Sequence, residues 1–241
     1  MEETAGRIEK WIASKVKEAG AKGAVVGMSG GLDSSVTAVL AKRALGKNVL
    51  GLVMPCDSCP GDAHRASLVA KKFGIKKENV NLTRAFELLN KTLPEADKKT
   101  VGNLKARLRM AVLYYFANNH NYLVLGTSNK SELAIGYFTK HGDSAADIEP
   151  LGDLYKTRVT ELAKFLNLPK SVIEAKPSAG LWEGQTDEKE LGMDYGKLDK
   201  ILEAIDKGKT EVIEREGIEK VKKMIKKSEH KKRMPDVCVI S

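Results

Sequence analysis

The alternation of apolar and polar positions divides the chain into strand-like runs and amphipathic helices. Short apolar runs predict strands over residues 24–28, 48–54, 79–82 and 122–125. Apolar residues at helical spacing predict helices over 5–19, from Ser34 onward, and over 62–73, 85–93, 102–118, 157–166, 195–205 and 218–225. In the long helix over 102–118 the predicted buried stripe includes Ala111 and Tyr115. The order of strands and helices predicts a parallel sheet with right-handed crossovers.

A glycine turn follows the first predicted strand. Residues 29–33 form this turn, and adjacent Gly30 and Gly31 let the backbone approach a ligand closely. Ser34 and Ser35 stand where the next helix begins, so its free N–H groups and positive dipole end point back into the turn. A strand, a glycine turn and a helix N-terminus together predict an anion site, and the usual anion is phosphate.

The turn differs from a Walker A loop, because no lysine directly precedes the serines at the end of this turn. An aspartate, Asp33, occupies the turn instead. A carboxylate beside phosphates repels them unless a cation lies between, so Asp33 points to a bridging Mg²⁺. The alternative is an ordinary strand-to-helix turn in which the glycines serve geometry alone.

Composition narrows the classes of protein that fit. The 241 residues are 42% hydrophobic, which is enough for a compact α/β domain. No apolar run is long enough to span a membrane, and Met1 to Thr4 lack the apolar core of a signal peptide, so we expect a cytoplasmic protein without membrane contact. Lys and Arg outnumber Asp and Glu 41 to 32, a net charge of +9 that suits a polyanionic ligand or RNA. We expect a single domain over 1–241 with a basic C-terminal tail over about 228–241.

Three cysteines are too few for a disulfide scaffold. Cys56 and Cys59 have the spacing of a redox or metal pair, but only His64 is near in sequence as a further ligand. The alternative is two cysteines without a role in the loop after the second strand.

The run Ser29 to Ser34, Ser-Gly-Gly-Leu-Asp-Ser, resembles the signature loop of the ATP pyrophosphatases, which cleave ATP between its α and β phosphates. Further blocks, in the family's order and over nearly the whole chain, resemble the ammonia-dependent NAD synthetases. They are residues 105–110 (KARLRM), 126–132 (GTSNKSE), 136–143 (GYFTKHGD), 150–157 (PLGDLYKT), 176–179 (KPSA), 183–188 (EGQTDE) and 229–235 (EHKKRMP).

This resemblance implies a fold and a reaction. The fold is a doubly wound, mainly parallel five-stranded sheet with helices on both faces, of the adenine nucleotide alpha hydrolase-like type. The reaction is the amidation of deamido-NAD to NAD with ATP, Mg²⁺ and ammonia, which passes through an adenylate and releases AMP and pyrophosphate. The resemblance also implies a homodimer. We expect free ammonia as the nitrogen donor, since the synthetase blocks occupy the chain, and no nucleic-acid partner.

The resemblance assigns roles to individual residues. ATP contacts are Gly27, Met28, Ser29, Gly30, Gly31, Leu32, Asp33, Ser34, Thr127, Lys156 and Ser178, and of these Asp33 and Lys156 are the catalytic residues. Metal ligands are Asp33 and Glu132. Contacts to deamido-NAD are Arg107, Lys140, Asp147, His230 and Lys231.

Without the resemblance, these positions have ordinary interpretations. Glu132 is an acid in a helix first turn, Lys156 a lysine at a helix start and Ser178 a loop hydroxyl. Arg107 is a charge on a helix surface, and the pair His230–Lys231 belongs to a solvated basic tail.

Two segments and two rival functions remain open. Residues 128–156 have weak periodicity, and a stretch this long without clear structure is more often functional than idle. The charged loop over 177–190 contains Trp182 and is typical of a mobile lid. A tRNA-modifying ATP pyrophosphatase and a nucleotide sensor without catalysis are the alternatives to an NAD synthetase.

Overall fold

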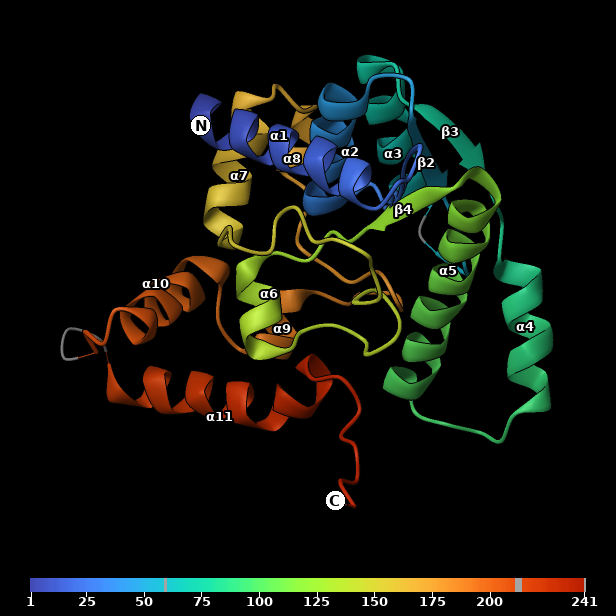
Figure 1. Ribbon diagram of the computed structural model, residues 1–241. Coiled ribbons are helices and arrows are strands. Elements are labelled where there is room, and N and C mark those ends of the chain that lie inside the picture. The colour runs from blue at the N-terminus through green and yellow to red at the C-terminus, as the bar shows by residue number, and fades with distance from the viewer. Residues whose placement is uncertain (59, 211–213, 241) are drawn as a thin grey trace.

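The protein is described by a computed structural model that covers residues 1–58, 60–210 and 214–240. Its four strands lie among helices between residues 23 and 125, and within the described residues only helices follow β4 (Figure 1). The elements are α1 (Glu2–Glu18), β1 (Gly23–Gly27), α2 (Leu32–Leu45), β2 (Val49–Val53), α3 (Pro60–Phe73), β3 (Lys76–Asn79), α4 (Thr83–Thr92), α5 (Lys98–His120), β4 (Tyr122–Leu125), α6 (Lys130–Ile135), α7 (Lys156–Phe165), α8 (Lys170–Ile173), α9 (Asp187–Leu191), α10 (Tyr195–Asp206) and α11 (Arg215–Lys232).

The sheet is parallel, with the strand order β3-β2-β1-β4. Ala24 of β1 lies opposite Val49 on one side and Leu123 on the other. The chain crosses from β1 to β2 to β3 on one side and returns past β1 to β4, so the predicted doubly wound topology is confirmed. The carboxyl ends of β1 and β4 are neighbours, and a ligand site is expected there.

The described residues contain four strands rather than the five that were predicted. Where a fifth strand would lie, a single parallel bridge joins Ile148 to Leu125, and the amide of Gly126 donates to the carbonyl of Ile148 at 2.9 Å. Pro150 follows two residues later. Since proline has no N–H to donate, the pairing cannot continue as a ladder.

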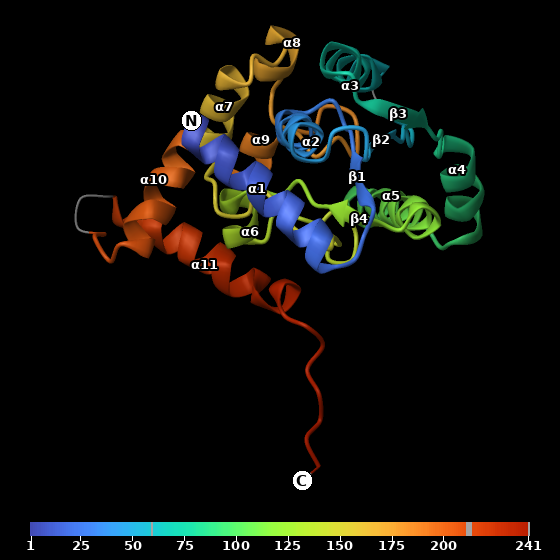
Figure 2. The same cartoon turned by 45° about the horizontal axis from the view of Figure 1, so that its top comes forward.

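Helices cover both faces of the sheet, as predicted (Figure 2). Side chains of a strand alternate between the two faces. Ala24 and Val26 pack into a core with α1, α2, α3 and α7, whereas Val25 packs with α4 and α5 on the other face. Both faces are therefore buried, which explains why β1 is a continuous apolar run rather than an alternating one.

A third apolar cluster joins α6, α9, α10 and α11 beside the sheet (Figure 1). Leu198 and Ile201 of α10 are fully buried against Ile218 and Val221 of α11. The helix α11 continues to Lys232, beyond the end predicted for it at residue 225.

Three other sequence predictions need correction. The third strand is Lys76–Asn79 rather than 79–82, because an edge strand does not need apolar side chains and the polar run pairs with β2. The long helix begins at Lys98 rather than at residue 102, and the Asp97 side chain caps it by accepting from the Thr100 amide at 2.7 Å. Ala111 and Tyr115, expected in its buried stripe, are exposed.

Among the helices that the structure describes, none is both long and apolar enough to cross a bilayer.

Candidate active site

The glycine turn joins β1 to α2 and leaves a helix N-terminus open. Gly30 has φ of +80°, and a Cβ at this position would lie 2.1 Å from the carbonyl oxygen of Asp62, so only glycine fits. The hydroxyls of Ser29 and Ser34 lie 2.9 Å apart and brace the turn. Gly31 is the N-cap of α2, and no side chain caps the helix there. The first N–H groups of α2 therefore remain available to an anion.

The turn opens onto a cleft of about 2000 Å³. Of the eight turn residues predicted to bind ATP, six line this cleft, whereas Gly27 ends β1 and Gly30 shapes the turn. Thr127, Lys156 and Ser178 line the cleft as well. The structure thus brings most of the predicted ATP contacts to one place, although they come from four separate segments of the chain.

A buried acid–lysine cluster lies beside the turn. The ammonium Nζ of Lys156 lies 2.5 Å from Asp33 Oδ2 and 3.3 Å from Glu132 Oε1. The Lys156 side chain is 7% exposed, and each of the two acids is 15% exposed. Asn129 Nδ2 donates to the other oxygen of Asp33 at 3.0 Å. The residues predicted to bind metal and to catalyse therefore meet in one charge cluster, across a separation of 123 residues for Lys156 and Asp33.

Burial and neighbouring charges shift the pKa values of this cluster. Burial raises the pKa of Glu132 to about 7, and the nearby carboxylate of Asp33 adds to this rise while Lys156 opposes it. Burial alone would lower the pKa of Lys156, but the attraction of Asp33 and Glu132 outweighs burial and raises it. Lys156 is therefore a permanent cation, and Glu132 is poised to change its charge near neutral pH.

Hydrogen bonds position α6 and α7, two of the three helices that carry the cluster. Asn129 and Glu132 form a capping box at the start of α6, in which each side chain accepts from the other residue's amide. The buried carboxylate of Asp199, on α10, accepts from the hydroxyl of Ser131 and from the amide of Thr157. The start of α7, and with it Lys156, is thus anchored to α10.

Three residues of this site, Asn129, Asp187 and Tyr195, were not predicted from the sequence. Asn129 holds Asp33, and the hydroxyl of Tyr195 lies 2.9 Å from Asp187 Oδ2 and 3.4 Å from Glu132 Oε1. The spacing of Asn129 and Glu132 is a capping-box signal that could have been read from the sequence. Asp187 lies within the block 183–188, but nothing in the sequence pairs it with Tyr195.

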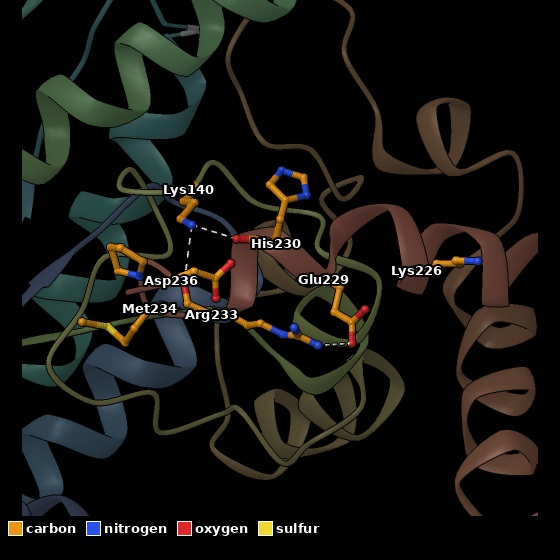
Figure 3. Close-up of a pocket in the computed structure, with 8 residues that line it drawn as sticks. Lys140, Lys226, Glu229, His230, Arg233, Met234 and Asp236 are labelled. Carbon is orange, nitrogen blue, oxygen red and sulfur yellow. Dashed lines mark hydrogen bonds and ion pairs between the residues drawn. The ribbon is translucent and has the colours of Figure 1, made fainter. Parts of the chain in front are cut away.

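Four of the five residues predicted to bind deamido-NAD line the main cleft, and two of them also line a second hollow. This hollow has a volume of about 440 Å³, and Lys140 and His230 line both it and the main cleft (Figure 3). Lys140 Nζ donates to the carbonyl of His230 at 2.7 Å, and Arg107 donates to the carbonyl of Lys140 at 3.2 and 3.3 Å. Lys231 Nζ donates to two carbonyls of the segment that follows α6. These cations therefore tie α5, residues 136–140 and the end of α11 together.

Asp147 lies apart from these residues. Its carboxylate accepts from the amide of Val124 at 2.7 Å and from the hydroxyl of Tyr114 at 3.2 Å, and it lines neither hollow. Burial and this neighbouring carboxylate raise the pKa of Tyr114 to about 12. The structure therefore does not bring Asp147 to the other predicted dinucleotide contacts within one chain.

The cysteine pair receives no support as a metal site. Cys56 is fully buried, and burial raises the pKa of its thiol, whereas Cys59 lies outside the described residues. In the parts of the chain that the structure describes, no three His, Cys, Asp or Glu side chains are grouped so that they could hold a metal ion by themselves.

The fold and the site together define a class. A doubly wound sheet, with an open helix N-terminus and a buried acid–lysine cluster at the carboxyl ends of its strands, belongs to an α/β protein built to hold a polyphosphate.

Comparison with known proteins identifies the family. The NAD synthase family matches residues 4–235. The chain is 53% identical over 249 residues to the NH(3)-dependent NAD(+) synthetase of Methanocaldococcus jannaschii, across 98% of this chain and 96% of that relative. Its structure resembles an NMN synthetase from Francisella tularensis, with a TM-score of 0.91, 35% identity and 98% of both chains covered. It also resembles an NH3-dependent NAD synthetase from Campylobacter jejuni in complex with the nitrate ion, with a TM-score of 0.87, 31% identity and 99% of both chains covered. The chain belongs to the NAD synthase family, as its motif blocks indicated.

Proposed function

We infer that the protein is an ammonia-dependent NAD synthetase, which uses ATP and ammonia to amidate deamido-NAD and releases AMP and pyrophosphate. The observation that carries this conclusion is the buried cluster of Asp33, Lys156 and Glu132 directly beside an open helix N-terminus. Membership of the NAD synthase family and the relatives described as NH(3)-dependent NAD(+) synthetases support the same reaction.

The first step activates the substrate carboxylate, which is a poor acyl donor. An oxygen of the carboxylate on the pyridine ring attacks the α-phosphorus of ATP. The bond between this phosphorus and the oxygen that bridges it to the β-phosphorus breaks, and pyrophosphate leaves with the electron pair. The N–H groups at the start of α2 hold the β and γ phosphates. Lys156, a permanent cation in the cleft, stabilises the charge that develops on the leaving group.

The donor set fits a magnesium ion. Asp33 and Glu132 offer hard carboxylate oxygens, and Lys156 already supplies one positive charge between them. Mg²⁺ is usually held by one or two carboxylates together with phosphate oxygens and water, so these two acids would suffice beside bound ATP. When bound, the ion would neutralise phosphate charge. Ionised Glu132 is required for this role, and a cation near it would lower its pKa from the raised value.

In the second step ammonia attacks the carbonyl carbon of the adenylate, the carbon–oxygen bond to AMP breaks, and the ammonia nitrogen gives up a proton. No protein nucleophile takes part, so catalysis is mainly positioning and electrostatics. Arg107, Lys140, His230 and Lys231 would hold the dinucleotide, whose phosphates suit cations. Asp147 can contact deamido-NAD only if the substrate is bound between this chain and a second copy of it.

An assay of AMP release tests the function. We expect AMP and NAD to form in equal amounts only when deamido-NAD, ATP, Mg²⁺ and ammonium are all present. AMP formation that requires tRNA and a sulfur donor would favour a tRNA-modifying enzyme. ATP binding without AMP under any of these conditions would favour a nucleotide sensor.

A second acceptor follows from one comparison. The solved structure from Francisella tularensis is described as an NMN synthetase, and its fold agrees with this chain over 98% of both. Nicotinic acid mononucleotide is therefore the rival substrate. Parallel assays with the mononucleotide and with deamido-NAD decide between the two substrates. We expect a larger kcat/KM for the dinucleotide, because the relatives described as NAD(+) synthetases are more similar in sequence to this chain than the NMN synthetase is.

We also propose that the protein is a homodimer in the cytoplasm. The resemblance stated above supports the dimer, and a few apolar side chains exposed on α4 and α5, such as Leu88 and Tyr115, are consistent with it.

A further inference from the structure

One run of α5 contacts three different loops around the cleft. Lys105, Arg107 and Arg109 stand at alternate positions, and each donates to a backbone carbonyl far away in the chain. Arg107 reaches Lys140, and Arg109 reaches Met54. Lys105 and Arg109 share one face of the helix because they are four residues apart. The resemblance gave a role to Arg107 alone and left the other two cations unexplained.

Lys105 is the buried member of this run. Its side chain is 4% exposed, and Nζ lies 2.8 Å from Asp57 Oδ2 and 3.1 Å from the carbonyl oxygen of Leu181. The ring of Phe86 lies 4.9 Å from the same nitrogen. A buried ammonium group is costly unless paired and hydrogen-bonded, so these partners are needed to keep it in place.

Leu181 belongs to the lid segment, residues 177–190, which forms one wall of the cleft. A second contact joins this segment to α5: a Cβ on Gly102 would lie 3.0 Å from Leu181 Cβ and 3.1 Å from the ring of Trp182. The lid segment also carries Ser178, which lines the cleft, and Asp187, which bonds to Tyr195. Gly102 and Lys105, about one helical turn apart, therefore hold the lid segment against α5.

We propose that Lys105 is a positioning residue that docks the lid segment onto α5 and thereby sets the affinity for the nucleotide rather than the rate of the chemical step. Lys105 does not line the cleft, so it acts through the lid segment. If the nucleotide binds only to molecules whose lid segment is docked, the apparent affinity falls in proportion to the fraction of docked molecules. The complex that does form is the same, so the rate of its chemical step does not change. The kinetic part of this proposal rests on the proposed function.

Fluorescence tests the docking directly and needs no activity. The chain has two tryptophans, so replacing Trp11 by Phe leaves Trp182 as the reporter of the lid segment. In this background we expect Lys105→Met to raise the acrylamide quenching constant of Trp182 by roughly twofold or more, because a charge-assisted hydrogen bond is lost. Lys98→Met, which removes an exposed cation from the first turn of the same helix, should leave quenching unchanged. Equal quenching in Lys105→Met and its parent would overturn the proposal.

A second variant keeps the charge and changes the fit. Gly102→Ala suits a helix but places a methyl group against Leu181, so it should raise the quenching of Trp182 as Lys105→Met does. Asp57→Asn separates the lid contact from the loop contact, since the Asp57 side chain is 67% exposed and Asn tolerates its φ of 50°. We expect Asp57→Asn to raise quenching clearly less than Lys105→Met does, because the Asn side-chain oxygen can still accept from Lys105 and the bond to Leu181 remains. An effect as large as that of Lys105→Met would assign Lys105 to the loop after β2 instead.

Steady-state kinetics provide the readout that a merely structural role would not give. Lys105→Met should raise KM for ATP roughly tenfold and change kcat less than twofold, and Lys105→Arg should restore most of the affinity. A fall in kcat at unchanged KM would overturn the proposal. If the parent enzyme does not amidate deamido-NAD at all, the proposed function fails while the quenching series still decides the role of Lys105.

Discussion

Glu132 is the residue whose charge the fold makes most conditional. It lies in a buried cluster with Asp33 and Lys156, and burial raises its pKa from 4.5 to about 7. A carboxyl group with such a raised pKa keeps its proton until the pH approaches neutral, whereas a bound cation favours the ionised form. The free protein and the protein with nucleotide and metal should therefore differ in the protonation of this one side chain.

The pH dependence of stability tests this assignment. Between pH 4.5 and about 7 the folded protein keeps a proton on Glu132 that the unfolded chain has lost, so the free energy of unfolding falls as pH rises through this window. The full effect is about 3 kcal/mol at most. Urea unfolding at pH 5, 6, 7 and 8 should show that Glu132→Gln gains stability relative to the parent as pH rises, whereas Glu219→Gln, at an exposed position, runs parallel to the parent. Parallel curves for both variants would contradict the assignment.

Substitution of Asp33 should affect ATP binding and the chemical step to different extents. Asp33→Asn keeps the size of the side chain but removes the charge that faces Lys156 at 2.5 Å. We expect kcat to fall by about 10²–10³, the loss typical of one preorganised charge, while ATP still binds with weakened affinity. Calorimetric ATP binding together with the AMP assay measures the two effects. The control is Asp153→Asn, since the Asp153 side chain is fully exposed, and a loss of binding equal to the loss of kcat would contradict the prediction.

At the scale of elements, the site depends on how a turn is packed against a helix. The turn between β1 and α2 passes so close to α3 that Gly30 touches the carbonyl of Asp62, and Arg65 Nε donates to the carbonyl of Gly30 at 3.1 Å. Asp62 and Arg65 both belong to α3, so this helix helps to set the shape of the anion site.

Two glycines with positive φ, one crowded and one in open space, give a test of that packing. Gly30 has φ of +80° and a crowded Cα, whereas Gly46 has φ of +61° and nothing within 4 Å of an added Cβ. Gly46→Ala should cost only the backbone strain of its positive φ, about 1–3 kcal/mol. Gly30→Ala should cost more and abolish ATP binding, because the clash involves backbone. Thermal melts and ATP titrations of both variants measure this, and equal effects would contradict the role of α3.

At the scale of the whole molecule, the apolar pattern of α5 indicates a partner surface. The helical stripe predicted Tyr115 to be buried, but its side chain is 69% exposed in the single chain. On α4, which packs beside α5, Leu88 is 60% exposed. Large apolar side chains that the single chain leaves exposed on α4 and α5 are consistent with an interface on this side of the protein.

The proposed homodimer would cover this side. Sedimentation velocity should give a mass near twice 26.3 kDa, and Tyr115→Asp should shift the protein toward the monomer by burying a charge in the interface. Phe165→Asp, at a 39% exposed position on α7, is the control that should leave the mass unchanged. A monomeric parent protein would contradict the dimer, and a dimeric Tyr115→Asp variant would place the interface elsewhere.

Much of the fold was predictable because its signals are local. Buried parallel strands are apolar runs, and the helices that cover them are amphipathic, so the order of elements and the doubly wound class followed from the pattern. Errors fell where local signals are weak: the edge strand β3 is polar, and the fifth strand is reduced to the bridge between Leu125 and Ile148. Tyr115 was predicted to be buried, because helical periodicity identifies an apolar face of the helix but does not indicate which segment packs on that face.

The sequence by itself determined the anion turn, since Gly30, Gly31 and the start of α2 lie within a few consecutive residues and their geometry is local. It also determined the family, through ordered motif blocks along the chain. Only the tertiary structure decided which charges meet. Lys156 reaches Asp33 across 123 residues, and Lys105 reaches Leu181 across 76. Such pairs depend on how helices and loops pack around the sheet, and a periodic pattern of apolar residues records that a face is buried but not which polar partner lies beside it.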